Sequence, residues 1–396
     1  MFENKSIIIG VSGGIAAYKT AYLVSALSKT EADVNVIMTK NACEFISPLV
    51  FETLTGNKCY VDTFDRNFKF DVEHISLAKK ADIFMIAPAT ANVIAKIANG
   101  IADDMLTTTF LASKCKKIVS PAMNTAMFEN QITQDNIAKL KKYEIGVVEP
   151  RNGLLACGDT GAGKMPEPDF LFDVIEREIA REKDMLGKKV LVTAGATMES
   201  LDPVRFLTNH SSGKMGFAIA KEAMLRGAEV TVVKANTTAE IPNFVKIVEV
   251  SSAKDMFDAV TALSDQQDII VKAAAVADYT PESYVDSKIK KKDGDLSIPL
   301  KRTMDILKYL GENKKEGQFL CGFSMETDNM LENSKAKLSK KNADMIVANN
   351  LRDAGSGFKT DTNAVTLITR DGHRSLELKS KAEVAKEIFD EILGLI

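Results

Sequence analysis

Near its start the chain reads Ser6-Ile-Ile-Ile-Gly10-Val-Ser12-Gly13-Gly14-Ile15-Ala-Ala-Tyr-Lys19, and this stretch decides the fold class. The apolar run from Ser6 to Val11 predicts a buried strand, and an amphipathic helix pattern follows the glycine pair as far as about Lys29. A strand, a glycine turn and a helix start together present backbone N–H groups that bind phosphate. The stretch therefore predicts an α/β fold with an anion site at its first turn.

The same turn does not match the dinucleotide pattern Gly-x-Gly-x-x-Gly, because Ser12 stands where the second glycine would be. The next predicted strand, 34–38, ends in Thr39-Lys40, which replaces the acidic residue that would hold an adenosine ribose. We therefore expect a mononucleotide or flavin phosphate at this turn rather than NAD.

Two further predicted strands end in small or polar residues. One covers 81–87 and is followed by Pro88-Ala-Thr90-Ala91-Asn92, and the other begins at Lys117 and leads into Pro121-Ala122-Met123-Asn124. Open α/β sheets bind ligands at the carboxyl ends of their strands. Two interpretations of Asn124 stay open: it caps the following helix, or it binds a carboxylate in a pocket beside Met123 and Met127.

The segment from Gly153 to Pro168 holds four glycines and two prolines, which predicts a mobile loop and no strand or helix interior. Cys157 lies in this segment among small residues. Either the cysteine is incidental to a turn, or the loop closes over a ligand and brings the thiol with it. His74 precedes a helical pattern, and the local sequence by itself favours a surface histidine near a helix start.

Five motifs follow one another through the first half of the chain: Gly13-Gly-Ile-Ala-Ala17, His74, Ala87-Pro-Ala-Thr-Ala-Asn92, Pro121-Ala-Met-Asn124 and Ala156-Cys-Gly-Asp-x-Gly-x-Gly163. Together they resemble the flavin-dependent cysteine decarboxylases, specifically the phosphopantothenoylcysteine decarboxylases. The resemblance implies a flavodoxin-like, three-layer FMN domain over residues 1–186, assembled as trimers with the flavin between subunits. The FMN contacts that it implies are Gly13, Gly14, Ile15, Thr39, Thr90, Ala91, Asn92 and Ala122.

The same resemblance implies three catalytic roles. His74 assists the oxidative half of the reaction by handling a proton, Asn124 orients the substrate carboxylate, and Cys157 supplies a proton when reduced flavin returns its hydride. Two positions depart from the family pattern, since Phe128 stands where many members have Trp and Lys164 stands where they have Arg. Phe128 keeps an aromatic wall, whereas Lys164 keeps the charge but loses the bidentate fork of Arg.

A second α/β cycle begins near Gly187, after a charged helix predicted over 171–184. In this half Ser211-Ser212-Gly213 enters a helix predicted over 217–226, and such a loop is either a phosphate cradle or a plain helix cap. Asp278 follows a predicted strand and is placed to accept hydrogen bonds from ribose hydroxyls.

Basic residues gather later in the second half. The run from Ser287 to Lys292 is by default a solvated turn. Lys337 and Lys341 lie four residues apart on a helix predicted over 332–341, so they share the face on which they would meet a triphosphate.

Three motifs of the second half occur in order: Asp202-Pro-Val-Arg-x-Leu-Thr-Asn209-x-Ser-Ser-Gly-x-Met-Gly216, Ala274-Ala-Val-Ala-Asp278-Tyr and Lys288-x-Lys-Lys291. They resemble the phosphopantothenate–cysteine ligases of the bacterial, CTP-using kind. The resemblance implies a Rossmann-like ligase domain over residues 187–396, in which Lys288 is needed to form an acyl-cytidylate and Asn209 acts on that intermediate. The CTP contacts that it implies are Ala274, Asp278, Lys288, Asp305, Ile306, Phe323, Lys337 and Lys341.

Two positions of this half depart from the family pattern, since Met304 and Ala196 stand where Pro is common. Both changes affect the stiffness of loops and leave the polar residues intact. Mg²⁺ is expected across the CTP phosphates, although the sequence does not identify its protein ligands.

The two resemblances cover nearly the whole chain and imply a fused, bifunctional enzyme of coenzyme A synthesis. Its substrates would be phosphopantothenate, cysteine and CTP. Trimeric first domains and dimeric second domains would require a higher homo-oligomer, such as a dodecamer. Two alternatives stay open for the first domain: a non-catalytic flavoprotein that regulates a protein partner, and a flavin prenyltransferase, which has no need of Cys157.

Length and composition are those of an ordinary soluble globular protein. A chain of 396 residues predicts about two to three domains. The net charge of −3 gives no reason to expect nucleic acid as a partner, and the apolar runs are too short or interrupted for a membrane span. Five scattered cysteines and three histidines indicate reduced thiols, a cytoplasmic location and no structural zinc site.

Overall fold

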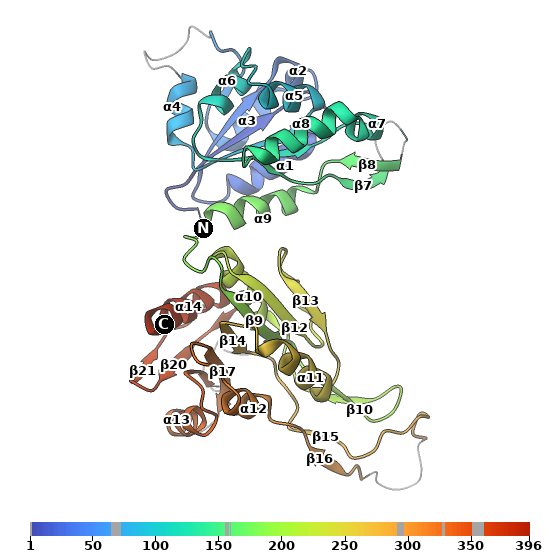
Figure 1. Cartoon of the computed structure of the whole chain (residues 1–396), viewed down its shortest axis with the longest axis vertical. Helices are drawn as coiled ribbons and strands as arrows, with labels where there is room; N and C mark the ends of the chain where they lie inside the picture. The colour runs from blue at the N-terminus through green and yellow to red at the C-terminus, as the bar shows by residue number, and fades with distance from the viewer. Residues whose placement is uncertain are drawn as a thin grey trace. The chain divides into compact units, whose positions relative to one another are not determined.

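The computed structural model describes residues 2–64, 73–154, 158, 160–290, 297–326, 329–350 and 360–396. The chain divides into two compact units, Met1–Arg181 and Glu182–Ile396 (Figure 1). Each unit has one main, mostly parallel sheet with helices on both faces. In the described part no helix is long and apolar enough to cross a membrane.

The first unit alternates strands and helices. Its strands are β1 (Ser6–Val11), β2 (Asp33–Met38), β3 (Cys59–Tyr60), β4 (Ile83–Ala89), β5 (Lys116–Pro121), β6 (Gly146–Val147), β7 (Arg151–Leu154) and β8 (Thr160–Lys164). Its helices are α1 (Ala17–Leu27), α2 (Lys40–Cys43), α3 (Pro48–Thr55), α4 (Glu73–Lys80), α5 (Ala91–Ala98), α6 (Met105–Ala112), α7 (Thr125–Glu129), α8 (Gln131–Lys142) and α9 (Pro168–Ile179).

The main sheet of this unit is parallel throughout, in the order β3-β2-β1-β4-β5-β6. Helices α4, α5, α6 and α8 pack on one face, and α1, α3 and α9 lie on the other (Figure 1). Because both faces are covered, β1 is buried at every position, as its continuous apolar sequence requires. Without the short edge strand β3 the order is the one found in flavodoxin-like sheets, so the predicted three-layer fold is confirmed.

The segment that follows β2 forms two separate helices, α2 and α3, rather than one continuous helix. Helix α3 begins at Pro48, and the Ser47 side chain accepts a hydrogen bond from the Leu49 N–H. Proline has no N–H to donate to a preceding turn, so it favours the first position of a new helix over the interior of a continuing one.

The loop predicted over 153–168 is wrong in part, because β7 and β8 form an antiparallel hairpin. The glycines of β8 allow its backbone to lie close to neighbouring residues, so they are not a sign of mobility. A Cβ on Gly161 would lie 2.7 Å from Thr125 Oγ1, and one on Gly163 would lie 2.3 Å from the Met123 carbonyl oxygen. The Met123 N–H donates to the Gly163 carbonyl oxygen at 3.1 Å, so the hairpin lies directly against the end of β5.

The second unit repeats the α/β pattern. Its strands are β9 (Lys189–Ala194), β10 (Met198–Ser200), β11 (Phe206–Thr208), β12 (Glu229–Lys234), β13 (Lys246–Glu249), β14 (Ile269–Lys272), β15 (Tyr279–Pro281), β16 (Leu300–Arg302), β17 (Phe319–Glu326), β18 (Met345–Asn350), β19 (Thr362–Asn363), β20 (Val365–Thr369), β21 (His373–Ser375) and β22 (Lys379–Ser380). Its helices are α10 (Lys214–Leu225), α11 (Ala253–Ser264), α12 (Ile306–Glu312), α13 (Met330–Lys340) and α14 (Lys381–Leu395).

The main sheet of this unit has the order β13-β12-β9-β14-β17-β18-β20-β21. Its first six strands are parallel and follow the Rossmann order, which confirms the predicted fold class. At the far edge of the sheet, β20 and β21 form an antiparallel hairpin. Helices α11, α12 and α13 contribute to one core cluster, whereas α10 packs against α14 and β9. The predictions lacked α11, although a capping box between Ser252 and Asp255 marks its start.

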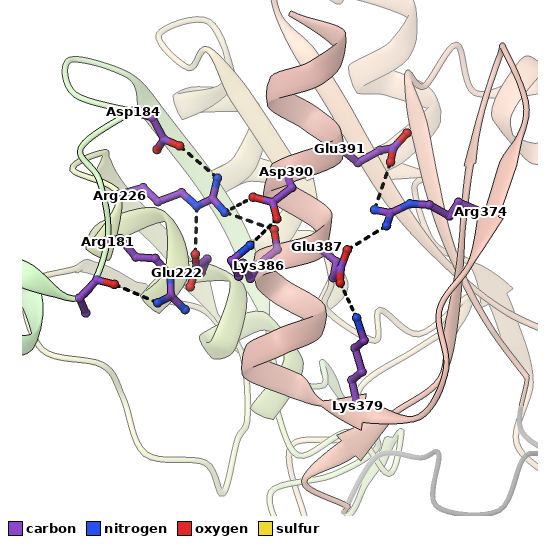
Figure 2. Close-up of polar contacts among 11 residues, drawn as sticks. Arg181, Asp184, Glu222, Arg226, Arg374, Lys379, Lys386, Glu387, Asp390 and Glu391 are labelled. Carbon is purple, nitrogen blue, oxygen red and sulfur yellow. Dashed lines mark hydrogen bonds and ion pairs between the residues drawn. The ribbon is translucent and has the colours of Figure 1, made fainter. Parts of the chain in front are cut away.

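Arg226 fastens α10 to α14 from a buried position, with 5% of its side chain exposed (Figure 2). Its guanidinium donates to Glu222 Oε1 at 2.9 Å and to Asp184 Oδ2 at 3.3 Å, and it also pairs with Asp390 of α14. Only 4% of the Glu222 side chain is exposed. On the side of α14 that faces β21, the exposed Arg374 pairs with Glu387 at 2.9 Å.

We expect Arg226→Ala to lower the free energy of unfolding of the second unit by about 3–5 kcal/mol, because it leaves the Glu222 carboxylate buried without its partner. The matched control is Arg374→Ala. Arg374 also forms an ion pair with α14, but its side chain is 46% exposed, so its loss should lower the free energy of unfolding by less than about 1 kcal/mol. Native-state hydrogen exchange of the α10 and α14 amides measures both effects. Equal decreases in the free energy of unfolding of the two variants would contradict the argument that burial makes the Arg226 ion pairs more important than those of Arg374.

Candidate active sites

A cavity of about 880 Å³ lies at the carboxyl ends of β1, β2, β4 and β5. The strand order reverses beside β1, and such a switch point is where open α/β sheets bind ligands. All the residues predicted to contact FMN line this cavity: Gly13, Gly14, Ile15, Thr39, Thr90, Ala91, Asn92 and Ala122.

The loops around this cavity are tied to one another. Ser12 Oγ donates to the Pro88 carbonyl oxygen at 2.7 Å and accepts from the Thr90 N–H at 3.0 Å. A Cβ on Gly13 would lie 2.5 Å from Asn41 Cβ and 2.8 Å from its carbonyl carbon. Only glycine allows this approach, and the helix start that follows it offers N–H groups to a phosphate. The residues present therefore fit a flavin phosphate at this turn.

We expect Gly13→Ala to weaken FMN binding by about tenfold or more, because the methyl group would push two cavity loops apart at a cost of about 1–3 kcal/mol. Gly14→Ala is the matched comparison, since its Cβ would lie at an ordinary 3.7 Å from Thr90 Cγ2. Flavin absorbance of the purified variants, followed during titration of apoprotein with FMN, measures both affinities. A Gly14→Ala loss as large as that of Gly13→Ala would contradict the packing argument.

Asn124 lines the first cavity and also caps α7, where its Oδ1 accepts from the Ala126 N–H at 2.9 Å. Both interpretations of this residue therefore agree with its position. Leu154 and Lys164, on the two strands of the β7–β8 hairpin, line the same cavity. The hairpin thus forms part of the cavity wall next to Asn124.

Of the three predicted decarboxylase residues, the described structure places Asn124 at this cavity. His74 lies half-buried on α4 and does not line the cavity of its own chain. Cys157 lies outside the described residues, between the two strands of the hairpin in sequence. Other residues that line the cavity were not predicted from the sequence. One is Lys19, whose Nζ donates to Glu167 Oε1 at 2.8 Å. Helical spacing gave no signal for Lys19, because its approach to the cavity depends on how α1 packs.

A second cavity of about 1040 Å³ lies at the carboxyl ends of β14, β17 and β18. Nearly all the residues predicted for the ligase half line it: Asn209, Ala274, Asp278, Asp305, Ile306, Phe323, Lys337 and Lys341. Lys288 is the exception among the predicted residues, because it is exposed and does not line the cavity.

The charge of the second cavity favours an anionic ligand. Its described lining contains seven basic residues and two acidic ones: Lys214, Lys272, Arg302, Lys337, Lys340, Lys341 and Lys381, against Asp278 and Asp305. Burial alone would raise the pKa of Asp305, but the Lys341 ammonium and the Lys308 N–H outweigh it, so the pKa is lowered and the carboxylate stays charged. In the described part of the chain no group of three or more metal-ligating side chains occurs.

The Ser211-Ser212-Gly213 loop also lines this cavity. Gly213 is the N-cap of α10 with a φ of 82°, and no side chain caps the helix. A Cβ on Gly213 would lie 2.4 Å from Thr237 Oγ1. The loop therefore leaves the start of α10 without a side-chain cap, as an anion cradle requires.

The segment that carries Lys288 is held by Asp202. Asp202 Oδ2 accepts from the Ile289 N–H at 3.0 Å, and Arg205 Nη1 donates to the Ile289 carbonyl oxygen at 2.9 Å. Burial would raise the pKa of Asp202, but the N–H groups of Ile289, Val204 and Arg205 outweigh it and the pKa is lowered. A charged, nearly buried carboxylate therefore fixes the backbone next to Lys288.

Two protein families match the chain, one over each unit. The Flavoprotein family matches residues 1–180, and the family described as the DNA/pantothenate metabolism flavoprotein C-terminal domain matches residues 185–395. Coenzyme A biosynthesis bifunctional protein CoaBC of Bacillus subtilis is 46% identical over 100% of this chain and 98% of its own length. The protein of the same name from Haemophilus influenzae is 41% identical over 99% of this chain and 98% of its own length.

Two solved structures are similar to separate parts of the chain. The C-terminal domain of a CoaBC bifunctional protein is 45% identical and covers 52% of this chain and 95% of its own, with a TM-score of 0.45. A PPC decarboxylase mutant complexed with pantothenoylaminoethenethiol is 30% identical and covers 43% of this chain and 96% of its own, with a TM-score of 0.40. From the family matches and the full-length relatives, we conclude that the chain belongs to the family of bifunctional coenzyme A biosynthesis proteins.

Proposed function

We propose that this chain joins phosphopantothenate to cysteine through an acyl-cytidylate made from CTP, and then decarboxylates the phosphopantothenoylcysteine to phosphopantetheine. Residues 1–186 would carry the FMN-dependent decarboxylase and residues 187–396 the ligase. One observation carries the proposal: a single chain holds two cavities at strand carboxyl ends, one lined by all the residues predicted for FMN and the other by those predicted for CTP except Lys288.

In the first cavity the turn after β1 would hold the flavin phosphate, with Thr39, Thr90 and Asn92 around the rest of the cofactor. When bound, the flavin supplies the electron sink that allows the substrate thiol to become a thioaldehyde and the neighbouring carboxylate to leave as CO₂. Asn124 would orient that carboxylate, and Cys157 would protonate the resulting enethiolate during the reductive half.

His74 would act on the flavin site of a neighbouring subunit. It does not line the cavity of its own chain, whereas the cavity rim carries Ile15 and Tyr18, which are 60% and 53% exposed. Tyr22, one helical turn further along α1, is 67% exposed. This apolar stripe supports a trimer in which one subunit covers the cavity of the next.

In the second cavity Asp278 would accept from the ribose, and Lys337 and Lys341 would bind phosphate oxygens. Carboxylates do not condense with amines at neutral pH, because hydroxide is a poor leaving group. Attack of the carboxylate on the α-phosphate of CTP would release pyrophosphate and give the acyl-cytidylate, from which CMP then leaves in place of hydroxide. Lys288 would offset the charge that develops on the α-phosphate. Mg²⁺ would be coordinated by oxygens of the other phosphates, as is usual for nucleotide-bound magnesium. Asn209 would act on the acyl-cytidylate.

We further propose a cytoplasmic enzyme that assembles from trimeric first domains and dimeric second domains. Exposed apolar side chains at β11 and in the segment near Lys288 support a pairing surface on the second unit, among them Phe206, Tyr284 and Val285. A dodecamer would satisfy both symmetries.

The test is a product assay on one purified chain with its bound flavin. Phosphopantothenate, cysteine, CTP and Mg²⁺ should give CMP, pyrophosphate and CO₂. CMP without CO₂ would contradict the decarboxylase half and favour a non-catalytic flavoprotein in its place. Prenylation of the flavin would favour the prenyltransferase alternative.

A further inference from the structure

Lys272 lines the second cavity, and no sequence motif pointed to it. It is the last residue of β14, between Thr193 of β9 and Gly322 of β17 in the sheet register. Its side chain is half-buried and lines the cavity. Within the described residues its side-chain ammonium donates no hydrogen bond and forms no salt bridge.

Charged groups surround Lys272 within the cavity. Lys337 comes from α13 and its Nζ donates to the Phe323 carbonyl oxygen at 2.9 Å, next to the register partner of Lys272. Lys341 follows α13 and pairs with Asp305 at the start of α12, while Asp278 follows β14. Burial, together with Lys337 and Lys341, lowers the pKa of Lys272 to about 8, although Asp305 and Asp278 oppose the shift.

We propose that Lys272 binds a phosphate group of the nucleotide in this cavity and takes up a proton as the nucleotide binds. The inference rests on the proposed use of CTP in this cavity. A phosphate supplies the acceptor oxygens that the described surroundings of Lys272 do not supply, and its negative charge offsets the repulsion from the two neighbouring lysines.

The sign of the pH dependence follows from this linkage. In the empty cavity Lys272 is mostly charged at about pH 7 and mostly neutral at about pH 9, because its pKa is about 8. A bound polyphosphate raises that pKa, so binding above about pH 8 requires proton uptake and becomes weaker as the pH rises. Deprotonation of Lys272 should therefore lower the affinity for the polyphosphate about tenfold between about pH 7 and about pH 9.

Calorimetric titration of the full-length, FMN-loaded chain with CTP and Mg²⁺ tests the proposal. Titrations at about pH 8.5 in buffers of different ionisation enthalpy measure the number of protons taken up. Wild type should take up most of one proton. Lys272→Met, which keeps the aliphatic stem, should lose this uptake and bind CTP about tenfold more weakly at about pH 7. Lys272→Arg should bind without proton uptake and with an affinity that stays constant to about pH 9.

Lys335→Met is the matched control, because Lys335 is exposed on the same helix as Lys337 and does not line the cavity. It should keep the proton uptake and the affinity of wild type. Two results would overturn the inference: wild type that binds CTP without proton uptake, and Lys272→Met with unchanged proton uptake. The first is measured on the wild-type protein, so it does not depend on whether a variant folds. Wild type that does not bind CTP would instead contradict the ligase function, and this inference with it.

Discussion

Lys288→Ala is expected to lower pyrophosphate release from CTP by about 10²–10³-fold while decarboxylation of supplied phosphopantothenoylcysteine continues at the wild-type rate. Lys288 is exposed and lies outside the second cavity, yet the backbone beside it is fastened to Asp202 and Arg205. Loss of the ammonium removes the charge that is proposed to act at the α-phosphate, and it leaves that anchor in place. Pyrophosphate release and CO₂ release from the same preparation measure the two activities.

Lys290→Ala is the matched control for this experiment, because Lys290 is an exposed lysine two residues further along the same anchored segment. It should change pyrophosphate release by no more than about a few-fold, as expected for a solvated charge. Retained pyrophosphate release in Lys288→Ala would rule out the proposed role. A parallel loss of CO₂ release would point to misfolding instead.

Cys157→Ser is expected to stop the reaction after decarboxylation, so that the enethiol accumulates and phosphopantetheine formation falls by about 10²–10⁴-fold. A serine hydroxyl is a far weaker acid than a thiol and cannot supply the proton. Flavin reduction should persist, because it precedes this step. The hairpin provides the structural support: Leu154 precedes Cys157 by three residues, Gly163 follows it by six, and both line the first cavity.

Flavin absorbance during a single turnover and mass spectrometry of the products separate the two half-reactions. Cys115→Ser is the control, since Cys115 is a partly buried thiol packed against the core of the first unit, and burial raises its pKa. It should leave turnover near the wild-type level. Normal phosphopantetheine formation by Cys157→Ser would exclude Cys157 as the proton donor.

Many of the residues predicted around both cavities lie there because they follow strands. Thr39, Thr90 and Ala122 come directly after β2, β4 and β5, and parallel strands bring their carboxyl ends to one edge of the sheet. For such residues local sequence is sufficient, since the topology of the sheet supplies the third dimension. The same reasoning holds for Asp278, which follows β14.

Residues that depend on packing between distant segments were predicted poorly. The hairpin of β7 and β8 was taken for a loop, because glycine content alone does not distinguish a mobile backbone from one that approaches Met123 and Thr125 closely. Lys272 carries no motif, and its importance follows from the charges that α12 and α13 place around it.

The sequence by itself determined that this chain has two α/β halves, and periodicity and turn residues placed most of their strands. It also indicated many of the residues that line each cavity. Only the tertiary structure decided that Gly13 touches Asn41, that Asp202 holds the backbone beside Lys288, and that Lys272 is half-buried among lysines. Strand patterns are local properties of a few residues, whereas close contacts and shifted pKa values arise from groups that only the folded chain brings together.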